Sequence, residues 1–315
     1  MPNTIRRVDA HVHIGSFAVL EDLSSEISSK SDVIGFRSRS PQKFAAQAEQ
    51  EVIDNTPQLL RALDRYALDA AIVMARPGVP DKKVAEMAGR HPDRLVPQLR
   101  IGLQQQLTGY LDDPTEYRAQ APDEISRSVR EHGFVGVGEI FIRSLTKAIH
   151  PEEIADDLGP LVERCIEEDI PVSFPTGWSQ WKGGLYYGDP VWLDELAGRH
   201  PDARFVLTKM GRGSVTIFET VMAVAMRNVN VSLDLTHSTS AHLSEAVRVL
   251  GASRVMFGTD WSATYQYLTE PNDVHGVTID MVNGADITDE DKELIMGRNA
   301  IRFFKLESRL GGSKP

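Results

Sequence analysis

The chain has 315 residues, of which 41% are hydrophobic and 25% charged, and this ordinary globular composition excludes wholesale disorder. The 34 basic and 45 acidic residues leave a net charge of −11, which argues against binding to nucleic acid or to an anionic membrane surface. A single cysteine, Cys165, excludes a disulfide framework and a thiolate metal cage. The N-terminus lacks the apolar core of a signal peptide, and no apolar run is long enough to span a membrane, so we expect a cytoplasmic protein.

Segments rich in Val, Ile, Leu and Phe alternate along the chain with segments of helical periodicity. Eight such units are the pattern of a (β/α)₈ barrel, an α/β fold, with a doubly wound open sheet as the alternative. We therefore predict one barrel domain over residues 1–307 and a flexible tail over 308–315. The predicted strands cover residues 5–13, 70–75, 95–101, 134–142, 170–174, 204–209, 229–235 and 254–260, and the predicted helices cover 57–66, 81–90, 123–131, 152–168, 190–200, 216–227, 242–250 and 289–305.

Three long insertions interrupt this alternation, at residues 15–55, 103–122 and 262–284. Each follows the carboxyl end of a predicted strand, on the face where barrels place their active sites. Long loops on a compact domain are typically lids or binding loops. We expect the first insertion to cover a substrate, with an oligomer contact or a mobile excursion as the alternatives.

A histidine pair stands at the end of the first predicted strand, in the sequence VDAHVHIG over residues 8–15. Side chains alternate along a strand, so His11 and His13 project to the same face, as a chelating pair must. In a closed barrel the eighth strand is the neighbour of the first, so Asp260 can reach both imidazoles. Asp260 could instead cap a helix, but a loop follows it. Glu139 ends the fourth predicted strand, where a carboxylate is costly to bury unless it faces a cation or solvent.

These motifs resemble the amidohydrolase superfamily, through VDAHVHIG and through FGTDW over residues 257–261. Further segments are similar to the amidohydrolase-2 branch, which holds the aminocarboxymuconate semialdehyde decarboxylase-like enzymes. The resemblance covers almost the whole chain and implies a metal-dependent barrel enzyme that performs hydrolysis, decarboxylation or hydration. The segments that carry the second resemblance are RPGVPD over 76–81, HPDRL over 91–95, GDPVWLDEL over 188–196 and MGRG over 210–213.

The chain departs from the pattern of this family at two positions. Pro175 stands where members carry a histidine at the end of the fifth strand, and Lys209 replaces a histidine at the end of the sixth. The resemblance assigns both missing histidines to the second metal of a binuclear site. It thus implies one divalent ion, zinc first with manganese or iron as alternatives, whose ligands are His11, His13, Glu139 and Asp260.

Lys209 can have one of three roles at the position of the second metal. Its ammonium can replace part of the missing positive charge, anchor a substrate carboxylate, or act as a base. Alternatively, Lys209 pairs with Glu139 or Asp260 and no metal binds.

The reaction expected first is metal-dependent hydrolysis of a C–N or C–O bond. In it, Asp260 is both ligand and general base, and Lys209 stabilises developing negative charge. The alternative is a metal-dependent decarboxylase or hydro-lyase acting on an unsaturated or aromatic acid, and the second alternative is a metal-free barrel without this chemistry.

Arginines and aromatic residues follow several predicted strands and favour a small, carboxylate-bearing, planar substrate. Each could instead have a structural role, as a surface ion pair or as packing under a lid. A homodimer is implied by the resemblance alone. The predicted substrate-binding residues are Arg76, Arg143, Thr176, Trp178, Trp181, Arg212 and His237.

Overall fold

The computed structural model describes residues 6–17, 51–76, 78–101, 117–144, 146–179, 183–261 and 273–310. Most of the predicted lid, most of the second insertion, the first part of the third and Trp181 lie outside these residues. The predictions that concern them stay predictions.

Within the described residues, seven short parallel strands form two groups, with the orders β1-β2-β3 and β4-β5-β6-β7. Almost every strand residue is buried, as expected for parallel strands covered by helices. The strands are β1 (Val8–Ile14), β2 (Ala70–Ala75), β3 (Leu95–Pro97), β4 (Val172–Pro175), β5 (Phe205–Thr208), β6 (Val231–Asp234) and β7 (Val255–Met256).

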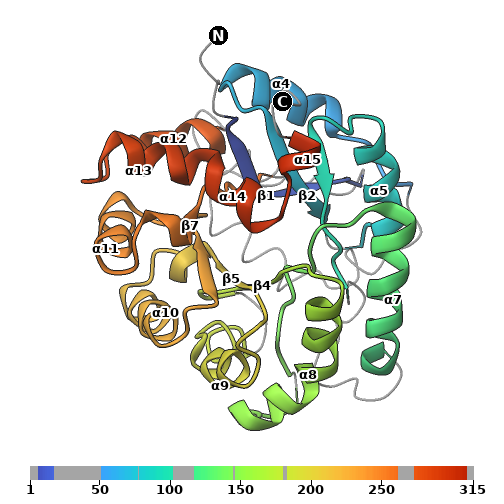
Figure 1. Cartoon of the computed structure of the whole chain (residues 1–315), viewed down its shortest axis with the longest axis vertical. Helices are drawn as coiled ribbons and strands as arrows, with labels where there is room; N and C mark the ends of the chain where they lie inside the picture. The colour runs from blue at the N-terminus through green and yellow to red at the C-terminus, as the bar shows by residue number, and fades with distance from the viewer. Residues whose placement is uncertain are drawn as a thin grey trace.

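Isolated bridges join the two groups into a closed ring. Val137 bridges to Leu99 on one side and to Val172 on the other, and Val12 bridges to Trp261. The part of the chain that the structure describes therefore places eight parallel segments, the seven strands and the segment around Val137, around a barrel, and each is called a stave; this confirms the predicted fold class. Figure 1 shows the helices surrounding these strands.

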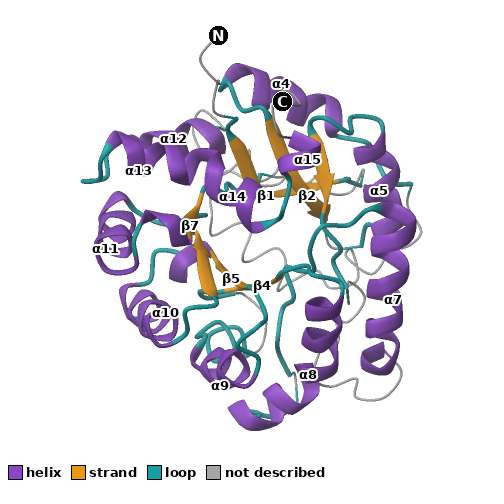
Figure 2. Cartoon of the chain, viewed as in Figure 1, coloured by secondary structure: helices purple, strands orange, loops and turns teal. Residues whose placement is uncertain are grey.

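The fourth stave differs from its prediction, because residues 134–142 form an extended segment and not a strand. Only Val137 makes bridges within it, and the segment between α7 and α8 is drawn as loop in Figure 2. Gly138 has a φ of +121°, which lies outside the strand region. The eighth stave is also shorter than predicted, with a strand of two residues.

The helices form the outer layer, and consecutive helices from α7 to α12 pack against each other. In α8 the buried residues recur at helical spacing, at Ile154, Leu158, Leu161 and Cys165. The helices are α4 (Thr56–Arg65), α5 (Asp81–Gly89), α7 (Tyr117–His132), α8 (Pro151–Glu167), α9 (Val191–Arg199), α10 (Val215–Arg227), α11 (Ser240–Leu250), α12 (Val274–Asn283), α13 (Asp289–Glu293), α14 (Asn299–Phe303) and α15 (Glu307–Leu310), with a π-helix (Leu294–Arg298) between α13 and α14.

Three predicted loops or tails contain helix in the structure. The helix α7 begins at Tyr117, inside the insertion predicted over 103–122, and α12 occupies the second half of the insertion predicted over 262–284. The tail predicted from residue 308 begins with α15, whose Leu310 is fully buried, because that side chain joins an apolar cluster with β1 and β2 residues. Among the described residues, no helix is long and apolar enough to cross a membrane.

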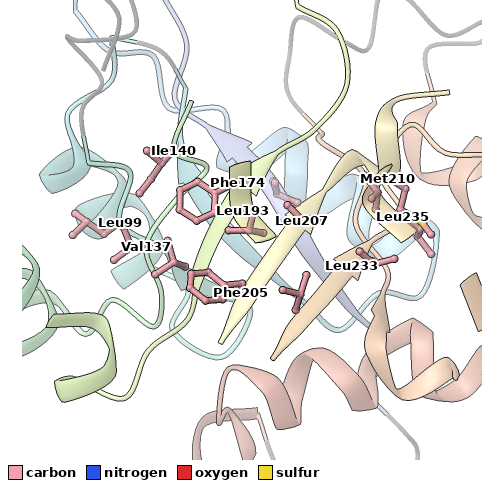
Figure 3. Packing of buried hydrophobic residues seen from close by; sticks show 14 of the residues in the cluster. Leu99, Val137, Ile140, Phe174, Leu193, Phe205, Leu207, Met210, Leu233 and Leu235 are labelled. Atoms are coloured by element: carbon pink, nitrogen blue, oxygen red, sulfur yellow. The ribbon is translucent and has the colours of Figure 1, made fainter. Parts of the chain in front are cut away.

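The core lies both inside the ring and between the ring and the helices. Figure 3 shows Leu99, Val137 and Phe174 from three adjacent staves in one packed group. Cys165 is also buried, and burial raises the pKa of its thiol, so it has the character of an inert core residue.

We expect Gly138→Ala to destabilise the protein by about 2–4 kcal/mol, because φ there is positive and the new methyl has no space. A Cβ at Gly138 would lie 2.3 Å from the carbonyl oxygen of Ser173. Urea unfolding measures this effect. The control is Gly198→Ala in α9, where a Cβ meets no atom within 4 Å, and which should stabilise by up to about 1 kcal/mol. Equal unfolding midpoints for the two variants would contradict this account.

Candidate metal centre and active site

The two histidines of β1 lie together inside the mouth of the barrel, as their alternation predicts. Their Nε2 atoms are 3.3 Å apart. His11 Nδ1 lies 2.7 Å from Asp234 Oδ2, and His13 Nδ1 lies 3.0 Å from the carbonyl oxygen of Ala75. A carbonyl oxygen only accepts, so in the tautomer with its proton on Nδ1 His13 donates to this carbonyl and directs a lone pair from Nε2 toward the site. The carboxylate of Asp234 orients His11 in the same way.

Two carboxylates approach these Nε2 atoms from other staves of the barrel. Glu139 Oε1 lies 3.7 Å from Nε2 of His11, and its Oε2 lies 3.7 Å from Nε2 of His13. Asp260 Oδ1 lies 3.1 Å from Nε2 of His13 and 3.7 Å from Nε2 of His11. All four residues are buried. The structure therefore brings together the four residues proposed from the sequence as metal ligands.

The donor atoms fit a divalent metal ion. A tetrahedral zinc site with bonds of about 2.0–2.1 Å separates its ligands by about 3.3 Å, close to the separations of 3.1–3.7 Å found here. His11, His13 and Glu139 form a group that could hold a metal ion. Two imidazole lone pairs facing each other across this distance need a cation or a proton between them. Mixed imidazole and carboxylate donors suit zinc, manganese or iron.

Lys209 lies against both carboxylates. Its Nζ is 2.5 Å from Glu139 Oε1 and 3.2 Å from Asp260 Oδ2, and the side chain is almost fully buried. Its ammonium thus lies against the carboxylates of the cage. Pro175, at the end of β4, lines a pocket and offers no donor there.

The charged groups of the site stabilise one another's ionised forms. Burial disfavours ionisation of Glu139 and Asp260, but the charge of Lys209 together with the contacts of His11 and His13 outweighs burial and holds the pKa of each carboxyl well below its usual range. Burial and Lys209 also oppose a charge on His11, yet Glu139 and Asp234 outweigh them and raise the pKa of its imidazole. The two carboxylates thus remain anionic and attract positive charge to the Nε2 atoms.

His237 follows β6 and contacts the outer oxygen of Asp260, with Nε2 3.1 Å from Oδ2. Its side chain is 27% exposed, so it connects the buried carboxylate with the surface. Desolvation lowers the pKa of this imidazole despite the nearby carboxylate. His237 therefore suits a proton-transfer position beside Asp260 as well as its predicted contact with substrate.

Three side chains of the site stand on left-handed backbone. The φ angles are +72° at Lys209, +54° at His237 and +56° at Asp260. Such conformations cost about 1–3 kcal/mol each in residues other than glycine, and they cluster at functional sites. The surrounding barrel holds this strain and aims the three side chains at one point.

A small pocket opens beside Lys209. Its lining includes four of the predicted substrate-binding residues, Arg143, Thr176, Trp178 and Arg212. The Arg212 guanidinium lies 4.7 Å from the centre of the Trp178 ring, a cation–π contact. Thr176 is engaged with backbone, because its Oγ1 donates to the Thr208 carbonyl and accepts from the Gly211 N–H.

Two predicted substrate residues do not line this pocket. Arg76 is buried at the end of β2 and donates to Ser16 Oγ, and His237 contacts Asp260 instead.

Two site residues were missed from the sequence. Asp234 orients His11 and Thr208 donates to Glu139 Oε1; the only signal for Asp234 was a carboxylate ending an apolar strand.

The amidohydrolase family model, Amidohydrolase-2, matches residues 8–306. The chain belongs to this family. No curated protein sequence matches this chain. Solved structures of the same fold include 2,6-dihydroxybenzoate decarboxylase in complex with 2,6-dihydroxybenzoate, which is 17% identical, with a TM-score of 0.65 over 96% of this chain and 99% of that one.

Two further solved structures are similar to this amidohydrolase. A dihydroxybenzoic acid decarboxylase from Polaromonas sp. JS666, with bound manganese and the inhibitor 2-nitroresorcinol, is 18% identical, with a TM-score of 0.63 over 96% of this chain and 97% of that one. The 4-oxalomesaconate hydratase from Rhodopseudomonas palustris is 16% identical, with a TM-score of 0.63 over 96% and 97%. At this identity the likeness shows the barrel fold alone.

Proposed function

We propose that this amidohydrolase is a metal-dependent lyase that decarboxylates or hydrates an aromatic or unsaturated carboxylic acid. The observation that carries the proposal is the position of Lys209, which contacts the cage carboxylates and also lines the pocket. A substrate carboxylate in the pocket can therefore meet the ammonium at the edge of the cage. The sequence favoured hydrolysis, but this pocket and the named substrates of the similar structures favour the lyase.

The pocket supports an anionic, planar substrate. Lys209, Arg143 and Arg212 supply three cationic side chains to its lining, and Trp178 and Tyr187 supply aromatic rings. Arginine favours carboxylates through its forked donors, and the rings favour a flat molecule. The bound acid in the decarboxylase of similar fold, 2,6-dihydroxybenzoate, has both properties.

The protein groups divide the work of the proposed reaction. His11, His13, Glu139 and Asp260 would hold a divalent ion, which would supply Lewis-acid chemistry there. Lys209 neutralises the substrate carboxylate, and the strained backbone beneath it limits its movement. In decarboxylation the bond to the carboxylate breaks, CO₂ leaves, and a proton is added to the ring carbon. Asp260 and the partly exposed His237, joined by a hydrogen bond, form the proposed path for that proton.

Hydrolysis is the second candidate, because the Asp260 carboxylate can also accept a proton from an attacking water. The position of Asp260, with Oδ1 toward the histidines and Oδ2 toward Lys209 and His237, favours this role equally. The two reactions differ in their products. Hydrolysis releases an acid together with an alcohol or amine, whereas the lyase releases CO₂ or changes an alkene absorbance.

Purified protein is expected to hold about one equivalent of zinc, manganese or iron, because the described donors form one cage. Elemental analysis after expression with each metal measures the content. Turnover of hydroxybenzoates and unsaturated dicarboxylates, followed by CO₂ release and ultraviolet absorbance, should be lost with a chelator and restored by the metal. Less than about 0.1 equivalent of every metal would sink the proposal, and metal-restored cleavage of esters or amides alone would favour hydrolysis.

A further inference from the structure

The segment that carries Glu139 is held by unusual partners. Its N–H groups bond to the neighbouring staves, with Gly138 N donating to the Leu99 carbonyl at 2.7 Å and Ile140 N donating to the Ser173 carbonyl at 3.0 Å. The carbonyls on the two sides of the Glu139 α-carbon, those of Gly138 and of Glu139 itself, accept instead from side chains. The position of this carboxylate therefore depends on the residues that donate those bonds.

The donors are Gln98 and Arg100, two residues apart just after β3. Gln98 Nε2 donates to the Gly138 carbonyl at 3.0 Å and to Ser173 Oγ at 2.9 Å. Arg100 Nε donates to the Glu139 carbonyl at 3.4 Å. Alternation along an extended chain places both side chains on the same face, and each is only 2% exposed. Buried donors of this kind hold a backbone firmly, because losing one leaves a carbonyl unsatisfied.

Arg100 also reaches the histidine pair. Its Nη1 donates at 2.7 Å to the Ala75 carbonyl, which is the acceptor that orients His13 through Nδ1. One guanidinium thus joins the backbone of Glu139 to the group that fixes the ring of His13. Glu139 and His13 are two of the proposed ligands, and they come from staves that are not adjacent in the barrel.

We infer that Gln98 and Arg100 are positioning residues that set the separation between Glu139 and His13 and thereby the affinity of the cage for metal. The inference rests on the proposed function, since it takes the cage as a metal site. Neither residue is itself a proposed ligand: Gln98 acts through a carbonyl, and Arg100 acts through two carbonyls and lies 3.4 Å from His13 Nδ1. Partners of metal ligands typically change affinity by about 10- to 100-fold when they are removed.

The test uses the full chain and Co²⁺ as the probe. The variants are Gln98→Met, Arg100→Met and Arg100→Lys, and a competing chelator measures the Co²⁺ Kd while the visible absorption of Co²⁺ reports its coordination. The control is Asn299→Leu, because Asn299 is also buried and also donates from one amide to two backbone carbonyls, those of Ala252 and Val255, at the start of β7. Thermal unfolding of the metal-free variants measures stability separately.

Gln98→Met and Arg100→Met are expected to raise the Co²⁺ Kd by about 10- to 100-fold and to change the absorption spectrum. Arg100→Lys, which keeps the charge and one donor position, should lie between Arg100→Met and the wild type. Asn299→Leu should lower the Tm with a Kd within about threefold of the wild type. Wild-type Kd values in the Met variants, or an equal loss in the control, overturn the inference alone, whereas a wild-type chain that binds no metal overturns the proposed function with it.

Discussion

Asp260→Asn is expected to weaken metal binding by about 100-fold or more and to lower turnover by about 10³-fold. The substitution keeps the shape of the side chain and removes its charge. Its Oδ1 lies within 3.1 Å of His13 Nε2, and its Oδ2 meets Lys209 and His237. An amide thus fails both as an anionic ligand and as the proposed proton carrier. Metal titration and initial rates at saturating metal separate these two effects.

The control for this variant is Asp194→Asn, which removes a carboxylate from the outer helix α9. Asp194 accepts bonds from Arg227 Nε and from the side-chain amide of Asn228. We expect it to cost stability while leaving metal affinity close to that of the wild type. If Asp260→Asn binds metal and turns over substrate like the wild type, Asp260 is neither ligand nor proton carrier.

Lys209→Met is expected to lower kcat by about 10²–10³-fold, because the variant loses the cation beside the pocket. The metal-free protein should also lose about 3–5 kcal/mol of stability, since Glu139 and Asp260 then remain buried without their counter-ion. Metal should bind at least as tightly as in the wild type, because removing the ammonium frees both carboxylates and ends its repulsion of a divalent ion. Urea unfolding without metal, metal titration and steady-state kinetics measure the three effects.

Lys83→Met is the comparison for Lys209→Met. Lys83 forms an exposed ion pair with Glu86, at 3.0 Å, and such pairs contribute about 0–1 kcal/mol. We expect wild-type kinetics and a small change in stability from it. Unchanged kcat in Lys209→Met would limit Lys209 to pairing with the carboxylates and would remove it from the proposed reaction.

The sequence predicted the barrel and the contents of the cage from local patterns. Strand alternation in β1 is a local property that places His11 and His13 on one face. Closure of the barrel then makes the first and eighth strands neighbours and brings Asp260 to the two histidines. The prediction for residues 134–142 was less accurate. Their apolar pattern is that of a strand, but Gly138 takes a positive φ and only Val137 keeps its bridges. Propensity does not reveal such a departure, because the neighbouring staves impose it.

The partners of the site residues could not be predicted. Asp234 is 223 residues from His11 in the chain, and no spacing rule connects them. The bonds of Gln98 and Arg100 to the Glu139 segment likewise exist only once three staves are adjacent. The sequence likewise left open whether Lys209 pairs with Glu139 or with Asp260. The structure pairs it with both carboxylates.

The sequence by itself determined the fold class, the face that carries the site and the types of side chain at the stave ends. These properties follow from periodicities of two and of 3.6 residues and from the order of the elements. Only the tertiary structure decided the donor separations, the orientation of the imidazoles and the ion pairs of Lys209. Those depend on distances of a few tenths of an ångström between residues far apart in the chain, and packing sets such distances where local preference does not.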